Sequence, residues 1–373
     1  MGNWMARIEA AEHYTTVEAF RAIIRTRILR LTRTEFLNDP NDTKVWSRFM
    51  TNFVDNNQQR IAQTVNQIAG DDGPQLLQLY WHAPIQGFMA FMQQRIKLYV
   101  MALSTDEDAI PMWNYYGYGG MEMSLDLNGF MKDLQAQLRP GSHEYIGAAR
   151  VIYVDSRANI AKARIAKDFQ DFLLADTNTL DLFTSDREAL IAQKQPVDVF
   201  ERTDLGQYID DFIESYIWSL RYLAKTRRVI SSTTPPAEIY AQLFENDTSA
   251  RGEYAWKKDL LLLFVMLTAA MKSNSYAYEK EYRVFYFDAS LSETPQKQEN
   301  FDIQELSGQK YLRPYVELAV PNLSDYLTRV TLSPLTQNLP VDTPVYLDVI
   351  QSLLHQYGFQ HVTVAGSQQQ IRW

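Results

Sequence analysis

The stretch 276–287, YAYEKEYRVFYF, places two glutamates and an arginine among aromatic and β-branched residues. Aromatic and β-branched residues favour β-strands, in which successive side chains alternate between the two faces. A continuous strand here puts Glu279, Glu281 and Arg283 on one face, with residues two apart about 7 Å from one another. The stretch therefore predicts a buried strand that carries a row of charges on one side.

Two interpretations of this row stay open. Two desolvated carboxylates raise each other's pKa unless a cation, here Arg283, offsets them. Burying such a pair is expensive, so its presence indicates a functional site. The same three charges also fit a structural ion-pair row at a sheet edge.

Outward from this stretch, segments with strand-like alternation frame segments with helical periodicity. AEHYTT reads as a strand that turns into a helix capped by Thr15 or Thr16, and MEMSLDL as a strand with its apolar residues on one face through Leu127. A helix from about 254 to 272 leads directly into the opening strand. We expect one α+β domain over 1–373, with a mixed or antiparallel sheet core and large helical insertions. The core comes from about 7–40, 96–156 and 273–373, and the insertions span about 42–95 and 157–272.

The composition sets further limits. Hydrophobic residues make up 46% and charged residues 22% of the 373 residues, which is typical of a globular protein. The sequence contains no cysteine, which excludes disulfides, thiolate metal sites and thiol nucleophiles. The N-terminal residues lack the apolar segment of a secretory signal, and the apolar run at 260–271 is shorter than the roughly 20 residues of a membrane span. We therefore expect a cytoplasmic protein that is not associated with a membrane.

The net charge of −9 argues against general nucleic-acid binding. One local group of basic residues runs against this trend. It fits either a phosphate-binding patch or a solvated face, and consists of Arg21, Arg25, Arg27, Arg30 and Arg33.

Three further motifs supply candidate site residues. HYT places His13, Tyr14 and Thr15 at the first strand-to-helix junction, and LNDP places Asn38 and Asp39 in a turn. A lone histidine is either a ligand-binding group or a structural one. MWNYYGYGG fits either an aromatic wall for stacking a flat ring or a core plug with a glycine turn, through Trp113, Tyr115, Tyr116 and Tyr118. No metal-binding, phosphate-loop or serine-hydrolase motif is present, so we expect no metal.

The order HYT, LNDP, MWNYYGYGG, YEKEYR, followed by a β-α-β ending, resembles a widespread, mainly bacterial family catalogued as a domain of unknown function. The HYT opening is similar to that of ADP-ribosyltransferases that act on nucleic acid, and the E-x-E strand is similar to that of arginine-type transferases. The resemblance implies an ADP-ribosyltransferase-like fold. It also implies NAD as a substrate.

This resemblance assigns roles to individual residues. His13, supported by Thr15, would bond the nicotinamide ribose or carboxamide, and Tyr115 or Tyr116 would stack on nicotinamide. Glu281 would be the catalytic glutamate. Glu279 would orient the acceptor or act as its general base. With Tyr14, Asn38, Asp39, Trp113 and Arg283, these residues form the expected site.

The expected function is an NAD-dependent ADP-ribosyltransferase, a toxin or phage-defence effector with an antitoxin partner. It would modify a macromolecule, with nucleic acid favoured over protein. Two alternatives stay open: a non-enzymatic interaction module, in which the charge row is structural, and a glycohydrolase that cleaves NAD without transferring it.

Overall fold

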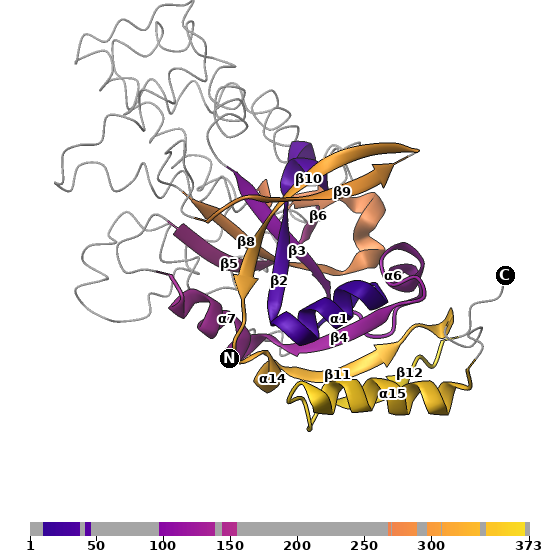
Figure 1. The fold of residues 1–373 in the computed structure, drawn as a ribbon. Helices are drawn as coiled ribbons and strands as arrows, with labels where there is room; N and C mark the ends of the chain where they lie inside the picture. Colours follow the sequence, from indigo (N-terminus) through magenta and orange to yellow (C-terminus); the bar gives the residue numbers. More distant parts are fainter. Residues whose placement is uncertain are drawn as a thin grey trace, which may run out of the picture.

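The computed structural model describes residues 10–37, 42–45, 97–138, 144–154, 268–269, 271–288, 297–306, 308–335 and 341–369. Within these residues the chain is mixed α/β, and its main sheet is open and mostly antiparallel (Figure 1). The expected helical insertions lie outside the described residues, apart from 42–45, 268–269 and 271–272. In the described part of the chain, no helix is both long and apolar enough to cross a membrane.

Ten strands of the described residues form the main sheet, in the order β12-β11-β4-β1-β3-β2-β10-β9, with β8 paired to β3 and β5 paired to β8. Neighbouring strands are antiparallel except for β11 and β12. Their bounds are β1 Ala10–Thr15, β2 Ile28–Arg33, β3 Leu98–Ser104, β4 Met121–Asp126, β5 Glu144–Arg150, β8 Glu281–Asp288, β9 Asn300–Leu306, β10 Gln309–Ala319, β11 Leu327–Leu332 and β12 Thr363–Gly366. A second, parallel pair joins β6 Ile152–Val154 to β7 Met271–Ser273.

The sheet forks at β3. One edge of β3 pairs with β8 along its whole length, from Leu98 to Ser104. The other edge pairs with β1 at Ser104 and with β2 at Tyr99 and Val100. Helix α1 (Val17–Thr26) connects β1 to β2 along the chain.

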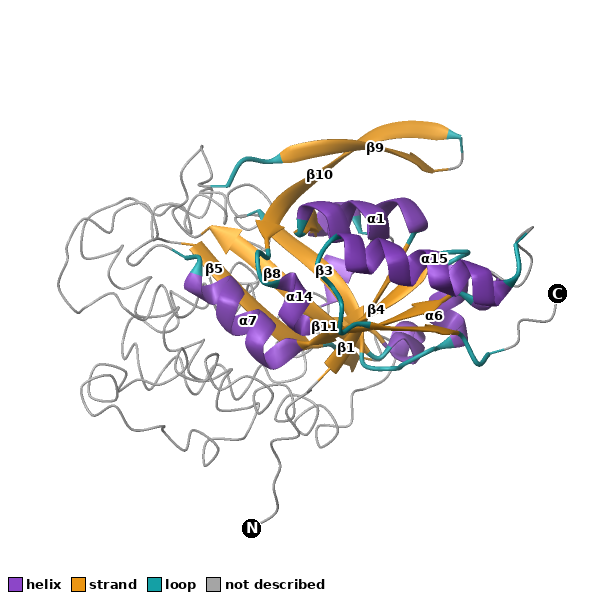
Figure 2. Cartoon of the chain, turned by 60° about the horizontal axis from the view of Figure 1, so that its bottom comes forward, coloured by secondary structure: helices purple, strands orange, loops and turns teal. Residues whose placement is uncertain are grey.

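Helices cover one face of the sheet. They are α1, α7 (Leu127–Ala136), α14 (Leu323–Tyr326) and α15 (Thr343–Gln356), and Figure 2 shows them lying together against the strands. Their apolar residues, such as Phe20, Phe130 and Leu354, pack with alternate strand residues, such as Met123 and Val284, in one buried cluster. Burial of apolar side chains at about 25 cal/mol per Å² is the main force that holds these layers together.

The expected helix cap at the end of HYTT is confirmed. The hydroxyl of Thr16 accepts the N–H of Ala19 at 3.2 Å, which satisfies one of the free donors of the first turn of α1. The expected end of the MEMSLDL strand is wrong by one residue. The strand stops at Asp126, whose carboxylate accepts the N–H of Asn128 at 2.9 Å and caps α7, so Leu127 starts a helix.

The expected continuous strand over 276–287 is also wrong in its first half. Residues Asn274–Glu279 form a 3₁₀ helix, η5, and Lys280 adopts the left-handed conformation with φ 43°. Only from Glu281 does the chain run as β8. The segment before it differs too, because Lys272 lies in β7 and not at the end of a helix. The 3₁₀ turn ends where the N–H of Lys280 reaches the carbonyl of Ala277.

The turn before β4 depends on a glycine. A Cβ on Gly120 would lie 2.0 Å from the carbonyl oxygen of Thr15, so the backbone has to move to admit it. We predict that Gly120→Ala lowers the free energy of unfolding by about 1–3 kcal/mol or more. Gly366→Ala is the matched control, because its Cβ would meet nothing closer than 3.8 Å. Urea unfolding monitored by circular dichroism measures both, and equal midpoints for the two variants would contradict the prediction.

Candidate active site

The face of the sheet opposite the helices carries a row of polar side chains. Paired residues of antiparallel strands share a face, and the register aligns one residue from each of five adjacent strands, β11, β4, β1, β3 and β8. In strand order these residues are Arg329, Ser124, Glu12, Ser104 and Glu281. We call them the polar row. Because neighbouring strands lie about 4.8 Å apart, the row collects charge across roughly 20 Å of one face.

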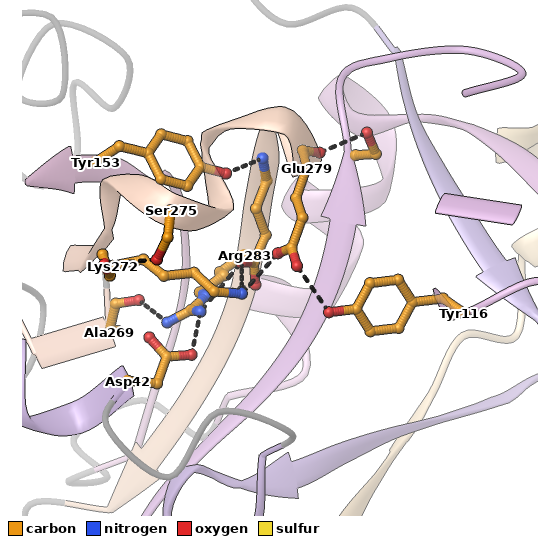
Figure 3. Close-up of polar contacts among 11 residues, drawn as sticks. Asp42, Tyr116, Tyr153, Ala269, Lys272, Ser275, Glu279 and Arg283 are labelled. Atoms are coloured by element: carbon orange, nitrogen blue, oxygen red, sulfur yellow. Dashed lines mark hydrogen bonds and ion pairs between the residues drawn. The ribbon is translucent and has the colours of Figure 1, made fainter. Parts of the chain in front are cut away.

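At the β8 end, the buried ammonium of Lys272 joins the two glutamates of the YEKEY motif, and Figure 3 shows it beside Glu279. The Nζ of Lys272 lies 2.6 Å from Oε2 of Glu279 and 2.8 Å from Oε2 of Glu281. Relative exposure is 5% for Lys272, 2% for Glu279 and 3% for Glu281, so little water screens these pairs. The three charges therefore interact at short range in a low-dielectric surrounding.

Arg283 completes this group from the other side of Glu281. Its Nε lies 2.6 Å from Oε1 of Glu281, and its Nη2 lies 2.5 Å from Oδ2 of Asp42. Its Nη1 donates to the carbonyl of Ala269 at 2.7 Å. Asp42 belongs to a short 3₁₀ helix, η2 (Asp42–Lys44). We call Asp42, Lys272, Glu279, Glu281 and Arg283 the Lys272 cluster.

The backbone at Lys280 brings the two glutamates together. In a continuous strand their side chains would project in parallel, about 7 Å apart. The left-handed residue between the 3₁₀ turn and β8 turns the chain, so both carboxylates reach one ammonium. A non-glycine residue with positive φ is uncommon and is found at functional sites more often than elsewhere.

Two further hydrogen bonds fix the backbone of the motif. The hydroxyl of Ser104 donates to the carbonyl of Glu279 at 2.8 Å, which ties the turn to the polar row. The N–H of Glu281 donates to the hydroxyl of Tyr153 at 2.7 Å (Figure 3).

The pKa values of the two glutamates are shifted in opposite directions. Burial raises the pKa of Glu279 above its ordinary value, against the opposing charge of Lys272. Burial also acts to raise the pKa of Glu281, but the charges of Arg283 and Lys272 outweigh it and lower the pKa to about 2. Burial raises the pKa of Asp42 as well. Glu281 is therefore the firmly ionised member of the pair, and Glu279 is the member that takes up a proton more readily.

Aromatic residues of the MWNYYGYGG segment reach this cluster from α6 (Ile110–Tyr115) and the turn after it. The hydroxyl of Tyr116 donates to Oε1 of Glu279 at 2.9 Å. The ring of Tyr115 lies 6.5 Å from that of Tyr116 and 5.9 Å from that of Tyr278, and Tyr276 follows at 6.4 Å from Tyr278. Tyr115 is 67% exposed and Tyr278 is 38% exposed. A row of tyrosine rings thus leads from the surface to Glu279.

Trp113 has a different place from these tyrosines. It is fully buried, its Nε1 donates to Oδ1 of Asp108 at 2.7 Å, and its ring meets Tyr14 edge to face at 4.9 Å. A Cβ on Gly117 would lie 2.6 Å from the Trp113 ring. Trp113 therefore fits the interpretation as a core plug, whereas Tyr116 bonds Glu279 and Tyr115 lies beside it.

A second group of acids lies further along the polar row. Oε1 of Glu12 accepts the hydroxyl of Ser124 at 2.8 Å. Oε1 of Glu122 accepts the N–H of Asp108 at 2.9 Å, and the hydroxyl of Tyr14 lies 3.3 Å from the same oxygen. Glu12 and Glu122 are both buried. Tyr14 thus belongs to this second group.

His13 lies on the other face of the sheet. Alternation along β1 directs it away from Glu12 and Tyr14, and it aligns with Met123, a residue of the helix-covered core. Its Nδ1 lies 3.4 Å from the carbonyl of Ala102, and burial lowers its pKa. Thr15 shares that face. The structure therefore brings Glu279, Glu281, Arg283 and Tyr116 together, and it does not bring His13 or Thr15 to them. Asn38 and Asp39 lie outside the described residues.

Sequence reasoning missed several members of both groups. Asp42 or Lys272 takes part in three of the four ion pairs of the Lys272 cluster, yet neither lies in a motif with the glutamates. Glu12 and Glu122 lie next to positions that we predicted as apolar strand residues. The sequence held one signal for Glu122, which is an acidic residue between the apolar residues Met121 and Met123 of a predicted strand.

The arginine group near the first strand is largely engaged within the molecule. Arg27 donates to the carbonyls of Pro321 and Tyr357, Arg30 stacks 4.5 Å from the ring centroid of Tyr315, and Arg33 bonds Glu35. Arg21 and Arg25 are exposed on α1. Among the described residues, no group of three or more acids and histidines is arranged to hold a metal ion.

The MWNYYGYGG and YEKEYR segments that form this site fall in one region of similarity to known sequences. A family model matches residues 112–284. The family is described as protein of unknown function (DUF2971). The match covers a little under half of the chain and leaves HYT and LNDP outside. The expected resemblance to a family of unknown function is thus supported over this region. No curated protein and no solved structure gives a significant match.

Removal of the central ammonium tests the electrostatics of the cluster. We predict that Lys272→Met lowers the free energy of unfolding by about 3–5 kcal/mol at pH 7, because two buried carboxylates lose a cation. The ion pairs of Glu281 stabilise the fold above its ordinary pKa of 4.5 and lose this effect as the pH falls toward 2. The deficit of the variant should therefore shrink near pH 4, where its carboxyl groups become protonated.

Urea titrations at pH 7 and pH 4 measure the deficit. Lys280→Met is the control, because it removes only an exposed pair with Asp106, worth about 0–1 kcal/mol. A deficit for Lys272→Met no larger than that of the control would show that the ammonium does not stabilise the cluster.

The left-handed backbone at position 280 gives a separate prediction. A β-branched residue is strained there, so Lys280→Val should destabilise the fold by about 1–2 kcal/mol. Lys280→Gly should match or exceed the stability of the natural protein, because glycine adopts positive φ without a steric penalty. Thermal unfolding at one pH compares the two, and a valine variant as stable as the glycine variant would exclude this conformation.

Proposed function

We propose that the Lys272 cluster is the catalytic centre of an NAD-dependent ADP-ribosyltransferase that modifies a macromolecule. The observation that carries the proposal is the pair of buried glutamates, two residues apart, whose pKa values are shifted in opposite directions. Two carboxyl groups separated in this way suit the division of labour between a permanent charge and a proton carrier.

The chemistry needs a negative charge at one point. When the bond between nicotinamide and ribose breaks, nicotinamide leaves with the bonding electrons and the anomeric carbon becomes positively charged. A fixed anion beside that carbon lowers the barrier. The Lys272 cluster holds three carboxylates against two cations, so it carries an excess of one negative charge when all are ionised.

The pKa shifts assign the roles. Glu281 stays ionised at any working pH, and Lys272 and Arg283 fix its position, so it is the permanent charge. Glu279, with its raised pKa, accepts the proton that the acceptor nucleophile loses as it bonds to the anomeric carbon. The tyrosine row beside Glu279 offers rings on which a flat heterocycle stacks.

The proposal also requires a movement. Glu279 is 2% exposed and its Oε1 is occupied by the hydroxyl of Tyr116. A substrate reaches this carboxylate only when Tyr116 gives up its hydrogen bond. Tyr116 therefore acts as a positioning residue at the entrance.

One observation favours a different function class. The ions of the Lys272 cluster are paired with one another at 2.5–2.8 Å, as in a structural network. In a non-enzymatic interaction module the cluster would stabilise the fold alone, and NAD would not be consumed.

Release of nicotinamide from NAD separates these functions. The purified protein is incubated with NAD alone and with total RNA, single-stranded DNA or a protein extract. Release that depends on an acceptor is expected for a transferase, and equal release without one indicates a glycohydrolase. No release under any condition contradicts the proposal and favours the interaction module.

The role of Glu279 is tested in the same assay. Glu279→Gln keeps the size of the side chain, and its amide can still accept from Lys272 through the oxygen and donate to the Tyr116 hydroxyl through the nitrogen, but it cannot accept a proton. We predict that it lowers the rate by about 100-fold or more. Glu317→Gln, which alters an exposed pair with Arg30, is the control and should keep the full rate. A fully active Glu279→Gln variant would remove this glutamate from the mechanism.

The pH dependence gives a further prediction. Because the pKa of Glu279 is raised above the ordinary value of 4.5, the natural protein should begin to lose activity at a pH above 4.5 as the pH falls.

A further inference from the structure

The carboxyl group of Glu122 and the hydroxyl of Tyr14 hold the loop between β3 and α6. Oε1 of Glu122 accepts the N–H of Asp108 at 2.9 Å. The hydroxyl of Tyr14 lies 3.3 Å from this oxygen and 3.0 Å from the carbonyl of Asp106, and it accepts the N–H of Ala109 at 2.8 Å. Glu122 and Tyr14 thus bond three backbone groups of the loop, at Asp106, Asp108 and Ala109.

The loop in turn holds α6. Asp108 has the left-handed φ of 50°, and its carboxylate accepts the Trp113 indole at 2.7 Å. The same carboxylate accepts the hydroxyl of Ser367 at 2.5 Å and the N–H of Gln368 at 2.8 Å. Trp113 lies three residues before Tyr116, so Asp108 is bonded to the segment that carries Tyr116.

Glu122 has a partner on the neighbouring strand. Glu12 on β1 aligns with Ser124 and Glu122 on β4 aligns with Tyr14, so the two glutamates are diagonal neighbours on one face of the sheet. Their Oε1 atoms bond other groups, whereas both Oε2 atoms are buried and have no hydrogen-bond partner within the described residues. Two carboxylates cannot hydrogen-bond one another unless one carries a proton.

We propose that Glu12 and Glu122 share one proton, and that this carboxyl pair positions the 105–109 loop and α6 so that Tyr116 meets Glu279. Whether the contact between Tyr116 and Glu279 serves catalysis rests on the proposed function. The shared proton and the position of the loop do not depend on the proposed function.

The surrounding charges are consistent with a single shared proton. Arg329 on β11 has its Nη2 4.0 Å from Oε1 of Glu12, and its Nη1 pairs with Glu107. Asp106 and Asp108 are the other acids of the loop, and Asp106 pairs with Lys280. One partly engaged guanidinium does not neutralise two buried carboxylates, which favours retention of a proton.

The expected titration has a definite sign. Burial raises the pKa of Glu122 to about 8, and the charge of Glu12 adds to this effect. The stabilising effect of the protonated form is complete below the ordinary value of 4.5. It declines as the pH rises from there and is lost once the pH passes about 8. Above that pH the two carboxylates repel one another and the loop loosens.

Amide hydrogen exchange of peptides that cover 106–117 reports on the loop directly. Glu122→Ala removes both the acceptor and the shared proton, and we expect protection in these peptides to fall about fivefold or more. Glu122→Gln keeps an acceptor for Asp108 and donates to Glu12, so it should retain protection. Tyr14→Phe keeps the ring but loses the hydroxyl, and should lower protection in the same peptides. Glu317→Ala is the control and should change nothing there.

The pH dependence separates a shared proton from a purely structural contact. After correction for the intrinsic exchange rate, protection of 106–117 in the natural protein should fall between pH 6.5 and pH 9.5. Glu122→Gln should show no such fall, because an amide does not titrate in this range. Equal protection of the natural protein at both pH values, or unchanged protection in both Glu122→Ala and Tyr14→Phe, would overturn the proposal.

The same variants in the nicotinamide assay distinguish this inference from the proposed function. Nicotinamide release that is sensitive to Glu279→Gln but unaffected by Glu122→Ala would overturn the positioning role and leave the proposed function intact. Absence of release from every variant, together with the expected exchange pattern, would overturn the proposed function and leave the carboxyl pair intact.

Discussion

The ammonium of Lys272 between Glu279 and Glu281 is the contact on which the charged side of this protein depends. An isolated ion in a protein interior costs several kcal/mol, and each member of the Lys272 cluster is tolerated only because the others are present. The cluster therefore behaves as a unit. Its ion pairs join β7, the 3₁₀ turn, β8 and the short helix at Asp42.

The two faces of the sheet divide the work of the molecule. Apolar side chains on one face pack under α1, α7, α14 and α15 and hold the strands together. The polar row on the other face aligns acids, serines and an arginine across five strands. The Lys272 cluster and the Glu12–Glu122 pair lie at different points along this row, and the 105–109 loop connects them. A single sheet face thus brings together both groups that bear on Tyr116.

Local patterns in the sequence were sufficient for most of the described strands. Alternation and capping residues located β1, β2, β10, β11 and β12, as well as the cap at Thr16. Alternation failed at 274–280 because the residues there alternate as in a strand, although they form a 3₁₀ turn that ends in a left-handed residue. The helix expected over about 254–272 does not extend to Lys272. This residue lies in β7, where pairing with β6 outweighs the local preference for a helix.

The candidate site was predictable in part. Charges among aromatic residues marked Glu279, Glu281 and Arg283, and the aromatic density of MWNYYGYGG marked Tyr116. Their counter-ions were not predictable, because Asp42 and Lys272 come from distant segments and no spacing rule links them to the motif. The sequence analysis grouped His13 with these residues. Alternation along β1 instead places Glu12 and Tyr14 on the polar face and His13 on the opposite face.

The separation of Asp42 from Arg283 also bears on how the molecule is made. These partners lie 241 positions apart in the sequence. During synthesis Asp42 emerges long before Arg283, and its carboxylate remains hydrated until the chain has been made as far as residue 283. Contacts between such remote positions form slowly, because a long loop has to close first. The ionic interior is therefore assembled late, and a nascent chain that stops short of β8 has no arginine to draw Asp42 out of water.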